Sequence, residues 1–338
     1  MVTHQLETEE TKLRRSSILV TWLRVAALVA CVQLGLTYSW VARAQQPEGA
    51  AALGAAAQAP GRGRGPQPVD PRVQIRTHRF TDTNEDIPYA LFVSSKVRKD
   101  TKAPMIVTLH GLGGTHTTMM RPNAIDLAEA GGYILLAPMG YNPRGWFGAP
   151  APQGRRGAPP ANAAAAAAVA SGAAAANPQA AAPGRRGGGR GGLNAPNDPP
   201  NLRELSEKET WQVIELVRKE FKVDDDRTYV MGHSMGGAGT LYLAMKHPKR
   251  WAAAAAIAPA AFSVDKAGLS RAPGIPMMIV HGDADTVVPV SVGRAWMEAI
   301  RAVPMRNFVY IEVPGGDHGS VISSHQADIF AFFSRHTR

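Results

Sequence analysis

The stretch Gly232-His233-Ser234-Met235-Gly236-Gly237 decides how this chain of 338 residues folds. It follows a short apolar run at 228–231 and precedes an apolar, helix-compatible stretch at 238–247. A strand, a Gly-x-Ser-x-Gly turn and a helix in this order are typical of a tight turn that presents the serine hydroxyl at the carboxyl edge of a sheet. Glycine is needed on both sides of the serine because larger side chains would collide there. The sequence therefore predicts a nucleophilic Ser234.

Two downstream segments carry groups that can activate such a serine. Residues 279–289 read as a strand that leads into a loop with two carboxylates, Asp283 and Asp285. Residues 308–313 read as another strand, followed by a turn that contains His318. An imidazole suits both proton transfers of acyl chemistry because its pKa lies near neutral pH. We therefore expect His318 to be the base, with a carboxylate beside it.

A further segment lies upstream. Residues 105–109 read as a buried strand that ends in His110-Gly111-Leu112-Gly113-Gly114. A glycine-rich turn after an early strand supplies an oxyanion-binding amide in hydrolases built on this kind of elbow. The order Ser234, Asp285, His318 also differs from the orders found in chymotrypsin and in subtilisin.

Together these segments resemble the α/β-hydrolase superfamily, and within it the secreted esterases related to polyhydroxybutyrate depolymerases, feruloyl esterases and prolyl-oligopeptidase-like peptidases. The resemblance covers about residues 73–336 and is interrupted by one insertion. It implies a single α/β-hydrolase domain whose mostly parallel sheet is covered by helices on both faces. It also implies that the backbone amides of Leu112 and Met235 hold the oxyanion. His110 is expected to brace the oxyanion turn.

The acid of the triad has two rivals. Asp283 lies two residues before Asp285, and Asp317 lies directly before His318. The family pattern His-Gly-x-x-Asp-x-x-Val-Pro places the acid at Asp285, which favours this residue. It would hold the imidazole in the correct tautomer and stabilise its charged form.

Three side chains are candidate substrate contacts. Trp146 and Phe147 follow a predicted strand and are placed to line an acyl pocket, although ordinary loop packing explains them equally well. His233 adjoins the nucleophile and has the same two interpretations, a substrate contact or an orienting role in the core.

The expected function is that of a secreted serine hydrolase that cleaves small-molecule or polymer esters through an acyl-enzyme. A serine peptidase is the first alternative, but its prolyl-oligopeptidase relatives normally carry a propeller domain, and no segment is long enough for one. A catalytically silent binding module is the second, and the loss of a triad residue would be its signature. The sequence has no phosphate loop, dinucleotide fingerprint or metal-ligand cluster, so neither cofactor nor metal is expected.

Composition bears on partners and on the cellular compartment. Most of the net charge of +10 lies in residues 1–72 and in the segment 148–200, outside the part of the chain expected to form the folded core, which gives a nucleic-acid role little support. Cys31 is the only cysteine, so a chain processed after residue 44 has neither disulfides nor a catalytic thiolate.

The N-terminal 44 residues read as a signal peptide. Basic residues between 12 and 24 precede an apolar run at 25–40, and Ala42-Arg43-Ala44 fits the rule for signal cleavage. We therefore expect a secreted or periplasmic protein. The basic region is long, so an uncleaved membrane anchor is the alternative, and lipidation at Cys31 is a weaker one.

Two low-complexity segments flank or interrupt the domain. Residues 45–72 are rich in Ala, Gly, Pro and Gln and are expected to form a disordered linker. Residues 148–200 are rich in Ala, Gly, Pro, Arg and Asn and are expected to be a disordered insertion within the domain at 73–336. A neutral surface excursion is favoured over an active-site lid.

Apolar periodicity and turn signals predict the other elements. Strands are expected at 73–80, 88–94, 105–109, 133–137, 252–257, 277–280 and 308–313, and helices near 123–130, 205–221, 291–300 and 321–333. Ser206 and Glu209 are expected to form a capping box where the second helix begins.

Overall fold

The computed structural model describes residues 69–152, 197–305 and 307–338. These residues belong to one compact unit, which extends over 62–338. The predicted signal segment at 1–44, nearly all of the predicted linker at 45–72 and residues 153–196 of the predicted insertion lie outside the described residues.

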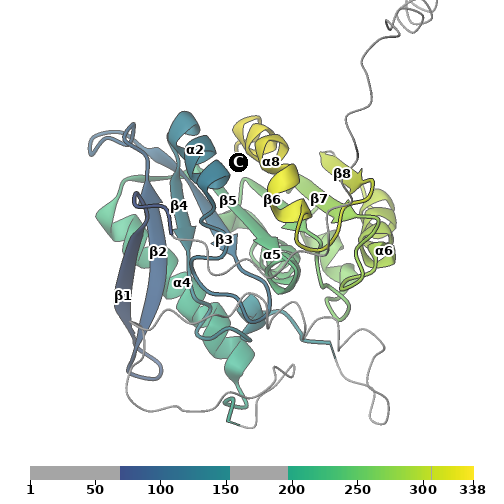
Figure 1. Ribbon diagram of the computed structural model, residues 1–338, viewed down its shortest axis with the longest axis horizontal. Helices are drawn as coiled ribbons and strands as arrows, with labels where there is room; N and C mark the ends of the chain where they lie inside the picture. Colours follow the sequence, from purple (N-terminus) through teal and green to yellow (C-terminus); the bar gives the residue numbers. More distant parts are fainter. Residues whose placement is uncertain (1–68, 153–196, 306) are drawn as a thin grey trace, which may run out of the picture. The chain divides into compact units, whose positions relative to one another are not determined.

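An eight-stranded sheet forms the centre of the domain (Figure 1), in the order β1-β2-β4-β3-β5-β6-β7-β8. β2 pairs antiparallel with both β1 and β4, whereas every neighbouring pair from β4 to β8 is parallel. The strands are β1 Gln74–Phe80, β2 Glu85–Val93, β3 Ala103–Leu109, β4 Ile134–Ala137, β5 Val223–His233, β6 Ala253–Ile257, β7 Met277–Gly282 and β8 Phe308–Val313.

Helices cover both faces of the sheet, which confirms the predicted fold class (Figure 1). α2 (Pro122–Gly131), α7 (Val321–Ser324) and α8 (Gln326–Ser334) pack on one face. α4 (Leu202–Glu220), α5 (Met235–Lys246) and α6 (Val290–Arg301) pack on the other. The alternation of side chains along each strand supplies both cores: in β3, Met105 and Val107 pack with α4 and α5, and Ile106 packs with α2 and α8.

The predicted capping box at the start of α4 is wrong. The helix begins at Leu202, so Ser206 and Glu209 lie inside it, and both side chains are buried. Ser206 Oγ accepts a hydrogen bond from the backbone of Phe147 at 3.0 Å, and Glu209 Oε2 accepts one from the backbone of Gly140 at 2.7 Å. The two polar groups therefore satisfy amides of a distant loop rather than amides of their own helix.

Two other boundaries differ from the expectation. The closing helix divides into α7 and α8 around His325, whose backbone is not helical. At the ends of the predicted insertion, Ala149 and Ala151 are buried in the core, and Asp198 pairs with Arg144 at 2.7 Å. These flanking residues therefore pack with the domain.

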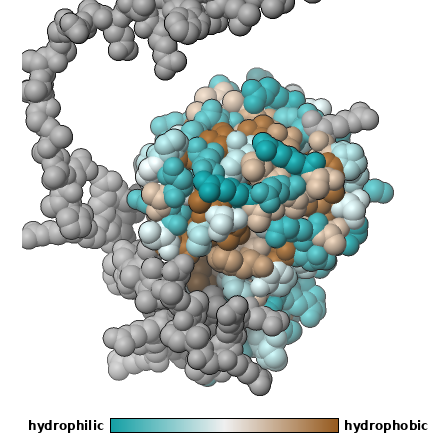
Figure 2. Space-filling view, turned by 90° about the vertical axis from the view of Figure 1, so that its right-hand side faces the viewer, coloured by the Kyte–Doolittle hydropathy of each residue, from teal (hydrophilic) through white to brown (hydrophobic). Residues whose placement is uncertain are grey.

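The surface on the side of β8 and α6 is shown in Figure 2, where hydrophilic residues are interspersed with small hydrophobic areas. Across the three described ranges, no helix has the length and apolarity needed to span a membrane.

Candidate active site

Ser234 lies at the turn between β5 and α5 with φ 56° and ψ −114°. Such a positive φ is strained for a residue with a side chain, so the surrounding structure must impose it. The backbone amide of Ser234 donates to the carbonyl of Ile257 at 2.9 Å, and its carbonyl accepts from the amides of Ala238 at 3.0 Å and Ala260 at 2.9 Å. These three hydrogen bonds fix the turn to the end of β6, to the loop that follows β6 and to the first turn of α5.

The two glycines of the motif are required by close backbone approach. A Cβ atom on Gly232 would overlap the carbonyl of Gly236, and a Cβ atom on Gly236 would overlap the carbonyl of Leu109. The Gly-x-Ser-x-Gly pattern predicts a tight turn because larger side chains would collide there, and these overlaps are that collision. The same contact seats the first turn of α5 on the end of β3.

The glycine-rich turn after β3 lies against this elbow. Leu109 pairs with Gly232 in the sheet, and a Cβ atom on Gly111 would lie 3.4 Å from Cβ of Ser234. The amide of Leu112 donates no hydrogen bond to any residue in the described ranges. Met235 is the first residue of α5, where backbone amides have no acceptor within the helix and the helix dipole is positive. Both amides proposed for the oxyanion therefore lie at the carboxyl edge of the sheet.

Asp285 and His318 follow β7 and β8 and are joined there by a 2.7 Å hydrogen bond between Oδ2 and Nδ1. Both residues are buried, as is Ser234. Oδ1 of Asp285 accepts from the backbone amides of Val287 and Val288, each at 2.8 Å. Burial alone would raise the pKa of Asp285, but these hydrogen bonds and the neighbouring histidines hold its pKa below the usual range. The carboxylate is therefore charged and fixed in orientation.

The rival carboxylates are engaged elsewhere. Asp283 Oδ1 accepts from the backbone amide of Gly315 at 2.7 Å, which ties the loop after β7 to the turn after β8. Asp317 Oδ1 accepts from the backbone amides of Gly319 and Ser320 within its own turn. Only Asp285 of the three contacts the ring of His318 among the described side chains.

Two more histidines support this pair. His233 Nε2 donates to the carbonyl oxygen of His318 at 2.8 Å, and the two rings lie 4.5 Å apart. Burial, with the neighbouring His318, lowers the pKa of His233 to about 3, so the ring is neutral. His281 Nε2 donates to the carbonyl of Val288 at 2.8 Å and lies 3.5 Å from Asp285 Oδ2. His233 thus has an orienting contact to His318. His281 lies against Asp285 and was not predicted from the sequence, although it opens the His-Gly-x-x-Asp pattern.

The Ser234 hydroxyl makes no hydrogen bond within the described part of the chain. The serine nevertheless shares the sheet edge with the Asp285–His318 pair, because β5, β6, β7 and β8 are all parallel neighbours. Catalytic hydrogen bonds of this kind often tighten only when substrate binds.

Trp146 and Phe147 do not lie at an open surface. Their side chains are 2% and 0% exposed and belong to the core beneath α4 and α5. The ring of Phe147 meets the ring of His110 edge to face at 5.1 Å. This burial favours the packing interpretation of both residues over a substrate-binding one.

An exposed aromatic residue that the sequence reading missed lies beside the elbow. Phe262 is 49% exposed, on the loop that follows β6. The loop is anchored just before it, since Ala260 donates to the carbonyl of Ser234 and the carbonyl of Ala261 accepts from Trp296 Nε1 at 3.2 Å. An aromatic side chain in the loop that follows a central strand is the sequence signal that could have identified it.

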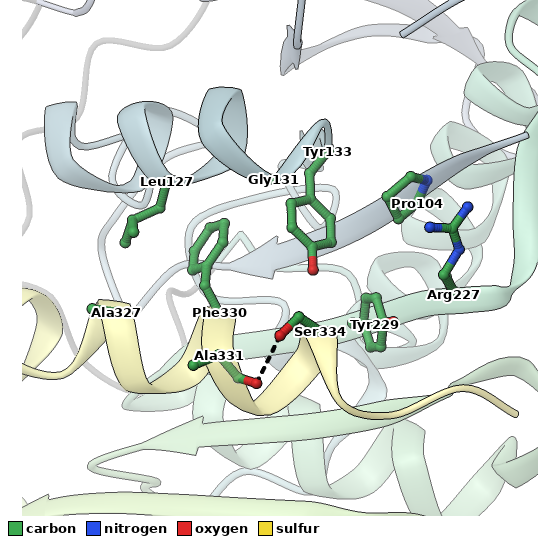
Figure 3. Close-up of a pocket in the computed structure, with 10 residues that line it drawn as sticks. All are labelled: Pro104, Leu127, Gly131, Tyr133, Arg227, Tyr229, Ala327, Phe330, Ala331 and Ser334. Atoms are coloured by element: carbon green, nitrogen blue, oxygen red, sulfur yellow. Dashed lines mark hydrogen bonds between the residues drawn. The ribbon is translucent and has the colours of Figure 1, made fainter. Parts of the chain in front are cut away.

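Within the described ranges, no group of three or more His, Cys, Asp or Glu side chains is arranged to hold a metal ion. A cavity of about 370 Å³ lies between α2 and α8 (Figure 3). It is lined at the strands by Pro104, at the amino end of β3, and by Arg227 and Tyr229, in the middle of β5. Ser234 follows the carboxyl end of β5 and does not line this cavity.

Comparisons with known proteins agree with this architecture. The family model "Esterase" matches residues 192–265, which include the elbow. S-formylglutathione hydrolase of Rattus norvegicus is 37% identical over 68 residues, which are 20% of this chain and 24% of the relative. The crystal structure of a thermostable esterase has a TM-score of 0.54 at 22% identity and covers 80% of this chain and 64% of that chain. The CE1 ferulic acid esterase of Anaeromyces mucronatus, in complex with ferulic acid, has a TM-score of 0.53 at 17% identity and covers 82% of this chain and 96% of that chain.

The sequence match is local, since the chain spans about a quarter of the length of the rat hydrolase. The structural likeness extends over most of the described domain and shows the fold. The domain therefore has the α/β-hydrolase fold of these esterase structures, and residues 192–265 match the Esterase family model.

Proposed function

We propose that this protein is a serine hydrolase that cleaves carboxylic esters through a triad of Ser234, His318 and Asp285. The observation that carries the proposal is the buried 2.7 Å hydrogen bond between Asp285 and His318 at the sheet edge that presents the strained serine. The match of residues 192–265 to the Esterase family model and the likeness to a ferulic acid esterase support an ester as the substrate.

In the first half of the reaction, Ser234 Oγ attacks the ester carbonyl carbon while His318 Nε2 takes the hydroxyl proton. A carbon–oxygen bond forms and the carbonyl oxygen becomes an oxyanion. Asp285 stabilises the resulting imidazolium through Nδ1 without taking up its proton. The bond to the leaving alcohol then breaks, and the imidazolium returns the proton to the alcohol oxygen.

In the second half, water replaces the alcohol. His318 accepts a proton from the water as its oxygen attacks the acyl carbon, and the proton then returns to Ser234 Oγ as the acid leaves. In both halves the backbone amides of Leu112 and Met235 hold the oxyanion. One such donor contributes typically ~3 kcal/mol to transition-state stabilisation.

The substrate class follows from Phe262. An aromatic ring that stays exposed on an anchored loop beside the nucleophile offers an apolar wall to one side of the ester. We therefore place esters with an aromatic or long apolar group among the preferred substrates. His233 takes the role of positioning His318 and does not contact the substrate.

We also propose export of the protein, on the basis of the basic and apolar pattern in residues 1–44. In a bacterial host, the mature protein should begin at Gln45 and be found outside the cytoplasm. N-terminal sequencing of the fractionated protein tests this, and an intact N-terminus in the membrane fraction would support an anchor instead.

Ser234→Ala should abolish hydrolysis of aryl esters and labelling by a fluorophosphonate, because it removes only the attacking oxygen. The melting temperature should stay close to that of the wild type. Labelling of a different serine in the variant, located by peptide mass spectrometry, would contradict the assignment of the nucleophile.

Asp285→Asn should lower kcat on the order of 10⁴-fold, by analogy with triads in which an amide favours the wrong histidine tautomer. Asp283→Asn is the matched control, because it lies two residues away and loses only the contact to Gly315. Steady-state kinetics of both variants decides between the two carboxylates. The assignment fails if the Asp283 variant is the more impaired.

Phe262→Ala should raise KM for aromatic esters about tenfold while leaving KM for acetyl esters nearly unchanged, since ~1.4 kcal/mol of lost contact corresponds to tenfold. Trp146→Ala is the contrasting variant. Removing that buried ring should lower the free energy of unfolding by ~3–5 kcal/mol instead. Equal KM changes on both ester classes in the Phe262 variant would exclude the proposed wall.

A further inference from the structure

A buried carboxylate, Glu209, lies outside the proposed triad and has no part in the mechanism above. Its side chain on α4 is 0% exposed. Oε2 accepts from the backbone amides of Gly140 at 2.7 Å and Tyr141 at 3.2 Å, and Oε1 accepts from His78 Nε2 at 3.0 Å. A carboxylate is costly to bury and persists in a core only where such donors compensate it.

The loop that it binds has an unusual backbone. Gly140 and Tyr141 both adopt left-handed conformations, with φ of 64° and 67°. Positive φ is unfavourable for a residue with a side chain such as Tyr141. Successive amides in turns of this kind form a concave site for an anion, and here the anion is supplied by Glu209.

The carboxylate is linked to the oxyanion turn through one peptide unit. The amide of Gly140 donates to Glu209, and the carbonyl of Met139 in the same peptide lies 3.0 Å from His110 Nε2. Because a peptide is planar and rigid, fixing its amide also fixes its carbonyl. Glu209 therefore determines where the ring of His110 meets the loop.

The ring of His110 in turn meets the peptide that carries the oxyanion amide. His110 Nδ1 lies 2.8 Å from the carbonyl of Gly111, which also accepts from the amide of Gly114 at 2.9 Å. Burial lowers the pKa of His110, so the ring is neutral and carries one N–H. The ring lies between the carbonyls of Gly111 and Met139 and donates to one of them at a time. The carbonyl of Gly111 and the amide of Leu112 belong to one planar peptide, so the orientation of this carbonyl sets the direction of the amide.

A second contact joins the same two loops. The amide of Gly113 donates to the carbonyl of Pro143 at 3.0 Å. The loop held by Glu209 therefore grips the oxyanion turn on both sides of Leu112, through His110 and through Gly113.

We propose that Glu209 is a positioning residue for the oxyanion hole, which it orients through the Met139–Gly140 peptide and His110. The inference rests on the proposed ester hydrolysis. In this proposal, α4 orients the oxyanion amide although the helix carries none of the triad residues.

The test is Glu209→Gln in the full chain, with kcat and KM for an aryl ester measured well below the melting temperature. The amide cannot accept from both loop amides and from His78 as the carboxylate does, so the loop should shift. We expect kcat to fall on the order of 10- to 100-fold. This decrease is no larger than the decrease in kcat caused by removing a whole oxyanion donor. KM should change little, because the interaction is formed in the transition state.

Glu207→Gln is the matched control on the same helix. Glu207 is also largely buried, but it pairs with Lys246 at 2.8 Å and His247 at 2.9 Å, at the far end of α5 from the elbow. This variant should lose stability and keep its kcat. A role of Glu209 in stability alone would give both variants the same behaviour.

Glu209→Asp covers the case in which the glutamine variant does not fold. It keeps the charge and withdraws the carboxylate by one methylene, so kcat should again fall with KM nearly constant. A wild-type kcat in the folded aspartate or glutamine variant overturns the inference. If in that case Ser234→Ala is inactive, the proposed function still stands, whereas an active Ser234→Ala variant would remove the proposed function itself.

Discussion

The structure depends on the close contact between the first turn of α5 and the end of β3. Gly236 lies so close to the carbonyl of Leu109 that no side chain fits between them. This approach lets α5 start directly beside the sheet edge, imposes a positive φ on Ser234 and brings the amide of Met235 next to the turn after β3. Strain at the serine is thus maintained by the packing of two elements that are far apart in the sequence.

The two buried carboxylates near the site are stabilised by backbone amides more than by oppositely charged side chains. Asp285 is compensated by the amides of Val287 and Val288 and by the ring of His318. Glu209 is compensated in the same way by two amides of a loop. In both cases a buried carboxylate organises a loop at the carboxyl edge of the sheet, and neither carboxylate pairs with a lysine or an arginine among the described residues.

The sequence was sufficient for the fold class and for the positions of most strands and helices. Strand patterns and the Gly-x-Ser-x-Gly turn are local signals, and they placed Ser234 at its turn between β5 and α5. The roles of Ser206 and Glu209 were not predictable, because their spacing imitates a capping box while their partners lie in a loop some sixty residues earlier. Trp146 and Phe147 likewise look like loop residues in the sequence, and only the packing of α4 and α5 shows that they are buried.

The ion pair between Arg144 and Asp198 has a consequence for how this domain can change. Its two hydrogen bonds, at 2.7 and 3.0 Å, join two residues that flank the segment 153–196 in the sequence. The entropy of closing a flexible loop grows only slowly with its length. The chain between Arg144 and Asp198 could therefore change in length with little disturbance to the fold around Ser234, which makes this position able to accept new sequence.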